Sequence, residues 1–149
     1  MALTQQINDD LKAAMKSGDK IKLATLRMLR AQIIDFEKKG LNREMNADDE
    51  LGILISGVKK RKEAIEQYAE AGRIDLVEQE TKELEIISAY LPKQMSREEA
   101  AAVVAGIIAQ SGAAGLKEMS KVMPLAMKEL KGKMDSKVIS DLVKEKLGA

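Results

Sequence analysis

The stretch that decides the fold class runs from Ser96 to Gly112 and reads SREEAAAVVAGIIAQSG. Its apolar centre, Val103 to Ile108, has the composition of a buried strand. Two features favour a helix instead. Ser96 with Glu99 three residues later is the sequence signature of a capping box, and the flanking alanines are strong helix formers. Because no other segment alternates apolar and polar residues between turn residues, the sequence predicts an all-α protein.

Four further helices are expected on the N-terminal side, at about residues 3–17, 20–39, 47–71 and 74–89. Asp19 can cap the second of these helices, and Asn46 or Asp48 can cap the third. The residues that end them are, in order, Gly18, Gly40, Gly72 and Pro92. Glycine commonly ends helices, and proline disfavours a helical residue before it.

The third helix contains two interior glycines, Gly52 and Gly57. Each costs about 1 kcal/mol relative to alanine in a helix, which suggests close packing at both positions. The apolar spacing of this helix places five residues in the core: Leu51, Ile55, Val58, Ile65 and Ala69.

Two more helices are expected on the C-terminal side. One covers about residues 116–131 and contains Pro124, which removes a backbone hydrogen bond and can kink the helix. Asp135 or Ser136 caps the last helix, which carries a regular set of apolar residues up to Leu147.

The predicted domain boundary is Leu91-Pro92-Lys93, where the charge balance changes. Residues 1–92 hold 15 Lys and Arg against 17 Asp and Glu, whereas residues 93–149 hold 10 against 7. We expect an N-terminal lobe of helical hairpins over residues 1–92 and a small three-helix C-terminal bundle over residues 93–149.

The composition excludes many kinds of active site. The 149 residues include no His, no Cys and no Trp, and the formal net charge is +1. A Ser-His-Asp triad, a thiol nucleophile, a disulfide and a zinc site with nitrogen or sulfur ligands are therefore all excluded. The acidic groups Asp9-Asp10 and Asp48-Asp49-Glu50 are candidates for magnesium binding, but Asp48, Asp49 and Glu50 lie at an expected helix N-terminus, where negative charge is favourable. We expect no catalytic residue, no metal site and no cofactor.

No apolar run approaches the 18 residues that indicate a membrane span, and the polar N-terminal segment lacks the apolar core of a signal peptide. We therefore expect no membrane partner and a cytoplasmic location.

A lysine stripe is the strongest candidate binding feature. If residues 116–131 form one helix, Lys117, Lys121, Lys128 and Lys131 fall on one side, opposite a face of leucine and methionine. Lys133 follows in the next turn. A stripe of one charge sign is suited to a phosphate backbone. The alternative, that these lysines form an ordinary solvated helix face, stays open. The predicted RNA-binding residues are Lys117, Lys121, Lys128, Lys131 and Lys133.

A second basic group, Lys59-Lys60-Arg61-Lys62, lies on the third helix. Four consecutive helical residues point in different directions, so they cannot form one face. If the chain turns back at Gly72, residue 61 lies opposite residue 83, and the acidic fourth helix neutralises much of the basic group. Phosphate binding by this group is the alternative.

Short motifs in a fixed order resemble those of a known family. They are Arg27-Met28-Leu29, Lys60-Arg61-Lys62-Glu63-Ala64-Ile65, Arg73-Ile74-Asp75-Leu76, Glu80, Glu83, Tyr90-Leu91-Pro92, Lys121-Val122-Met123 and Lys131-Gly132-Lys133-Met134-Asp135. Together they resemble the GatB/YqeY family, specifically its free-standing YqeY-like members. The resemblance implies an all-helical protein similar to the tail domain of the B subunit of glutamine-dependent aminoacyl-tRNA amidotransferase. That tail contacts tRNA away from the chemistry.

The resemblance and the lysine stripe together suggest a non-catalytic tRNA-binding accessory module with a role in translation. Its partners would be tRNA or another folded RNA, and an aminoacyl-tRNA synthetase or an amidotransferase component. The family label of carbon–nitrogen ligase with glutamine as amido-N-donor has no residues in this chain able to carry it. The alternative is a protein-interaction adaptor that docks on a translation-related enzyme.

Overall fold

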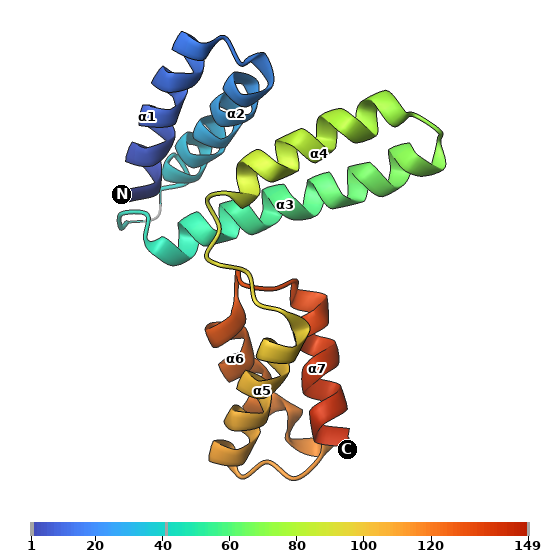
Figure 1. Ribbon diagram of the computed structural model, residues 1–149. Helices are drawn as coiled ribbons and strands as arrows, with labels where there is room; N and C mark the ends of the chain where they lie inside the picture. The colour runs from blue at the N-terminus through green and yellow to red at the C-terminus, as the bar shows by residue number, and fades with distance from the viewer. Residues whose placement is uncertain (1, 41, 149) are drawn as a thin grey trace. The chain divides into compact units, whose positions relative to one another are not determined.

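The computed structural model describes residues 2–40 and 42–148 (Figure 1). Within these residues it contains seven α-helices, one short 3₁₀ helix and no strand, which confirms the all-α prediction. The elements are α1 (Ala2–Ser17), α2 (Lys20–Glu37), α3 (Ala47–Glu70), α4 (Ile74–Ser88), α5 (Arg97–Ser111), η1 (Leu116–Glu118), α6 (Met119–Leu130) and α7 (Ser136–Gly148).

Two capping boxes fix helix starts. Before α5, the Ser96 hydroxyl accepts a hydrogen bond from the Glu99 backbone N–H at 3.1 Å, and the Glu99 carboxylate accepts one from the Ser96 N–H at 3.3 Å. Asn46 and Asp49 form the same arrangement before α3, so Asn46 rather than Asp48 is the cap. Each box satisfies backbone donors that a helix start leaves without partners.

The chain divides into two compact units, Met1–Leu91 and Pro92–Ala149. In the first unit, α1 pairs with α2, and α3 pairs with α4, as two antiparallel hairpins (Figure 1). Helix α2 packs against both α3 and α4. The fully buried side chains of this unit are almost all aliphatic, and the largest are Ile7, Leu26, Leu29, Ile33 and Ile87.

The buried line of α3 differs from the predicted one. Leu54, Gly57 and Arg61 are buried, whereas the predicted core residues are half-buried or, at Ala69, exposed. Apolar spacing missed this line because a glycine and an arginine occupy its centre. A Cβ atom added at Gly57 would lie 3.5 Å from Ile87 Cδ1, an ordinary van der Waals distance, so Ile87 packs over Gly57 but an alanine would also fit there. The expected close packing is not found at Gly52, where nothing lies within 4 Å.

Arg61 is a buried cation at the junction of α2, α3 and α4. Its guanidinium donates to the Gly57 carbonyl at 3.3 Å and to the Met28 sulfur at 2.9 Å. Its Nε lies 3.9 Å from a Glu83 carboxylate oxygen, which bears out the expected pairing of residues 61 and 83. Burial, and then the neighbouring Glu80 carboxylate, raise the pKa of Glu83, while Arg61 opposes both effects.

This arrangement predicts a pH-dependent effect of Arg61→Met. The substitution keeps side-chain volume but removes the cation that faces Glu83. We expect the free energy of unfolding at pH 7 to fall by about 1–2 kcal/mol. This loss is smaller than that for breaking a fully buried ion pair, because Glu83 keeps some contact with water. A carboxyl whose pKa is raised by folding favours the folded state most when it is protonated. The loss should therefore shrink as the pH falls toward 4.5, the ordinary pKa of a glutamate.

Urea denaturation at a series of pH values measures this effect. The double variant Arg61→Met with Glu83→Gln should recover most of the loss at pH 7, since no unpaired carboxylate is left at position 83. A loss that is the same at every pH would show that Arg61 acts through packing alone.

The second unit is a bundle of α5, α6 and α7 around its own aliphatic core. The fully buried members of that core are Ala100, Val104, Val122, Ala126, Leu130, Ile139, Leu142 and Val143. The segment that precedes α5 is tied to the turn after α6. The Met95 N–H donates to the Lys133 carbonyl at 2.9 Å, and the Gln94 side-chain amide donates to the Gly132 carbonyl at 2.7 Å.

We predict that residues 93–149 fold without the first unit. All the residues in their core belong to the same unit, and the length lies within the range of small domains that fold alone. Circular dichroism of this fragment should show a helical spectrum and a cooperative thermal transition. A spectrum without helix would contradict the prediction.

No single helix in the described part of the chain is long and apolar enough to cross a membrane. Helix α5 and the following segment Leu116–Leu130 reach that length and composition only as a pair, bent by 88° at the break between them.

Candidate functional site

Helix α6 carries the centre of the predicted lysine stripe. Val122, Ala126 and Leu130 are fully buried along one side of the helix. Lys121 and Lys128 are exposed and lie on the opposite side by helical spacing. The helix is therefore amphipathic as predicted, with two lysines directed away from the core.

The methionines of α6 flank its buried line. Met119, Met123 and Met127 are half-buried and pack against the core of the second unit. They fill space in a core that has no aromatic side chain.

Lys117 does not belong to the same helix as Lys121. The predicted helix over residues 116–131 begins at Met119, and Leu116–Glu118 form the separate 3₁₀ turn η1. A 3₁₀ turn has three residues per turn instead of 3.6, so the angle predicted for Lys117 on a single α-helical wheel is wrong. Lys117 is exposed, and Leu116, expected on the apolar face, is 56% exposed.

An acidic residue pairs with the lysine stripe. The Lys121 ammonium donates a hydrogen bond to the Glu118 carboxylate at 3.1 Å. This hydrogen bond, with one from the Ala114 N–H, lowers the pKa of Glu118. Lys121 is therefore partly neutralised by the side chain three residues before it.

Lys131 and Lys133 lie in the turn that follows α6. Both are half-buried, and an isolated β-bridge joins Lys131 to Met134. Gly132, between the two lysines, is buried and has a φ of 79°, a left-handed conformation that favours glycine. The five predicted residues therefore come from three local structures: η1 holds Lys117, α6 holds Lys121 and Lys128, and the turn holds Lys131 and Lys133.

Pro124 does not split α6, which continues from Met119 to Leu130. Pro124 is exposed on the same side as Lys121 and Lys128. The carbonyl that loses a donor belongs to Ser120, which is also exposed, so water can replace the missing hydrogen bond. This position explains why the proline is compatible with one unbroken helix.

The basic group on α3 is neutralised less than predicted. Arg61 alone is buried beside the acidic α4, whereas Lys59, Lys60 and Lys62 are exposed. Among the ion pairs found in the described residues, none includes these three lysines. The reason is the angular spread of consecutive helical residues, which directs only one of the four side chains toward α4.

The sequence profile of the Yqey-like protein family matches residues 4–147. The chain belongs to the YqeY-like family. The match covers both compact units and supports the resemblance inferred from the motifs.

Three relatives show how far the similarity extends. "Altered inheritance of mitochondria protein 41, mitochondrial" of Pyrenophora tritici-repentis is 31% identical over 150 residues, which is 97% of this chain and 80% of that protein. The protein of the same name from Lachancea thermotolerans is 38% identical over 89 residues, covering 57% of this chain and 46% of that protein. An uncharacterized protein of Schizosaccharomyces pombe is 33% identical over 90 residues, covering 60% and 72% respectively.

Proposed function

We propose that this YqeY-like protein is a non-catalytic module that binds folded RNA, with tRNA as the ligand to test first. The observation that carries the proposal is the pair Lys121 and Lys128, exposed on the side of α6 opposite its buried line. Lys117, Lys131 and Lys133 extend the positive charge at both ends of the helix. These lysines belong to the part of the chain with the net positive charge, residues 93–149.

The chemistry of the chain favours folded over single-stranded RNA. Proteins that bind single strands use aromatic side chains as stacking surfaces, and the second unit has none. A folded RNA presents phosphates at fixed spacing, which lysines on one rigid helix can contact. The absence of thiol and imidazole side chains supports a binding role rather than glutamine-dependent amide transfer.

The cellular compartment of this protein is also part of the proposed function. The composition predicts the cytoplasm, while several relatives carry names that describe them as mitochondrial. Either compartment contains tRNA, so the proposed ligand is available in both. An aminoacyl-tRNA synthetase or an amidotransferase component would be the protein partner.

The adaptor role is a second candidate, and exposed leucines favour it. Leu125 is 47% exposed between Lys121 and Lys128 on the helix surface, and Leu116 is 56% exposed in η1. Apolar side chains within a basic surface suit contact with a protein better than contact with phosphates.

Two matched double variants test the RNA proposal. Lys121→Gln with Lys128→Gln removes charge from α6, and Lys59→Gln with Lys60→Gln removes the same charge from α3. Each lost phosphate contact should reduce the slope of log affinity against log salt by up to about 0.9, the duplex DNA value. We expect the α6 variant to weaken tRNA binding and flatten its salt dependence more than the α3 variant does.

Salt-titrated binding of purified tRNA measures both quantities, and circular dichroism checks that helicity is unchanged. A larger loss in the α3 variant would place the RNA site in the first unit. No salt-sensitive binding by the unmodified protein would reject the RNA proposal and favour the adaptor.

Glu118→Gln should have the opposite effect. It removes the carboxylate that pairs with Lys121 at 3.1 Å and leaves the ammonium free to contact phosphate. The expected result is tighter tRNA binding with a salt slope steeper by up to about 0.9. Glu129→Gln, which removes one carboxylate of the same charge from the exposed surface of α6, is the control. Equal effects of the two variants would indicate a general change in net charge instead of release of Lys121.

A further inference from the structure

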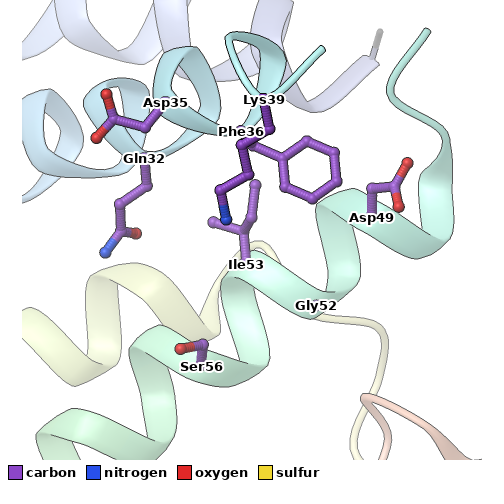
Figure 2. A pocket seen from close by; sticks show the side chains of 8 residues that line it. All are labelled: Gln32, Asp35, Phe36, Lys39, Asp49, Gly52, Ile53 and Ser56. Atoms are coloured by element: carbon purple, nitrogen blue, oxygen red, sulfur yellow. The ribbon is translucent and has the colours of Figure 1, made fainter. Parts of the chain in front are cut away.

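The first unit contains a cavity of about 440 Å³ between α2 and α3 (Figure 2). Gln32, Phe36 and Lys39 line it from the α2 side, and Gly52, Ile53 and Ser56 line it from α3. Its volume lies in the range of small-molecule sites, which combine apolar walls with a few polar groups. This cavity belongs to a different unit from the lysine stripe, so its occupancy is a separate question from RNA binding.

Gly52 leaves the α3 side of the cavity open. A Cβ added at Gly52 would meet nothing within 4 Å, so the missing side chain enlarges the cavity.

Gln32 gives the sign that the cavity has a use. Its side-chain Oε1 is buried and has no hydrogen-bond partner among the described residues. A buried polar atom without a partner costs about 1–3 kcal/mol, and such atoms are uncommon in folded proteins. A ligand in the cavity that carries a hydrogen-bond donor would satisfy this oxygen.

Phe36 and Lys39 define the rest of the chemistry. Phe36 is the one phenylalanine of the chain, and its ring lies beside the cavity with the Lys39 ammonium 5.9 Å from the ring centroid. In Figure 2 the Lys39 side chain reaches from the turn after α2 toward Ile53. An aromatic face beside a cation and an amide suits a flat ring that carries both a donor and an anionic group.

Asp35 and Asp49 also line the cavity, but they do not cancel the positive charge of Lys39. Asp35 points away from α3 in Figure 2. Asp49 is already engaged, because it accepts hydrogen bonds from Arg43 at 3.1 Å and from the Asn46 N–H at 3.0 Å. Lys39 is the one positively charged side chain among the residues that line the cavity.

We propose that this cavity binds an adenine nucleotide. The Gln32 amide would bond to the N6 and N7 edge of adenine, a pairing that glutamine makes through one donor and one acceptor. The Phe36 ring would stack on the base over the open surface at Gly52, and Lys39 would contact the phosphate. The nucleotide can be free or part of an RNA chain, since both present the same base and phosphate.

Binding of AMP to the full-length protein, followed by NMR, tests the proposal. We expect saturable binding below about 1 mM, with shifts of backbone amides at the end of α2 and the start of α3. An oligoadenylate of six nucleotides distinguishes the two sources. Tighter binding of the oligomer with shifts at the same amides would assign the site to adenine in RNA, and tighter binding of AMP would assign it to a free nucleotide.

A substitution that fills the cavity, compared with a matched control in the other unit, tests where AMP binds. Gly52→Leu places a side chain in the open space and should weaken AMP binding at least tenfold. Gly106→Leu is the control, because Gly106 also lies inside a helix with nothing within 4 Å of an added Cβ, but in α5 of the other unit. This control should leave AMP binding unchanged. Gln32→Leu should reduce the preference for AMP over GMP.

The variants of the lysine stripe keep this proposal separate from the RNA proposal. Lys121→Gln with Lys128→Gln should not change AMP binding, whatever it does to tRNA binding. The adenine proposal is overturned if neither AMP nor the oligomer shifts the cavity amides. It is also overturned if inorganic phosphate alone reproduces the shifts, or if free phenylalanine binds to the cavity in place of AMP. Equal AMP affinity in the Gly52→Leu and unmodified proteins would also overturn it.

Discussion

The contact between Gly57 and Ile87 sets the geometry of the first unit. Ile87 of α4 is fully buried, and its Cδ1 would lie 3.5 Å from a Cβ added at residue 57, an ordinary van der Waals distance. One turn along α3, Arg61 is buried opposite Glu83. Burial of the complete isoleucine side chain stabilises the hairpin of α3 and α4. The hairpin in turn provides the surface against which α2 packs.

Helix positions in this chain follow from local chemistry, which is why the sequence predicts them well. Ser96 with Glu99 defined the start of α5, and the glycines at 18, 40, 72 and 112 all have positive φ where the helices end. The buried line of α3 could not be predicted in the same way. Gly57 and Arg61 are buried because of what α4 places against them, and neither residue is apolar. The predicted pairing of residues 61 and 83 succeeded because it rested on hairpin geometry instead of hydropathy.

The candidate RNA site was likewise predictable from the sequence only in part. The sequence predicted that Lys121 and Lys128 lie opposite the buried face, because helical spacing alone determines that relation. Glu118 and Lys121 pair at the i,i+3 spacing that an α-helix also allows. The sequence could not predict the 3₁₀ turn at Leu116–Glu118, which moves Lys117 off the α-helical wheel. That change follows from backbone geometry after Gly115, and no side-chain pattern records it. The stripe is consequently less uniform in charge than its composition suggests.

The two interior glycines of α3 look equivalent in the sequence, yet their surroundings differ. Ile87 packs over Gly57 at an ordinary van der Waals distance. Gly52 lies on the α3 side of the cavity, where an added Cβ would meet nothing within 4 Å. Gln32 lies on the α2 side, and its buried Oε1 has no hydrogen-bond partner among the described residues. Within one cavity these features leave an acceptor without a donor and a volume unfilled by the protein, and a ligand can supply both the donor and the volume.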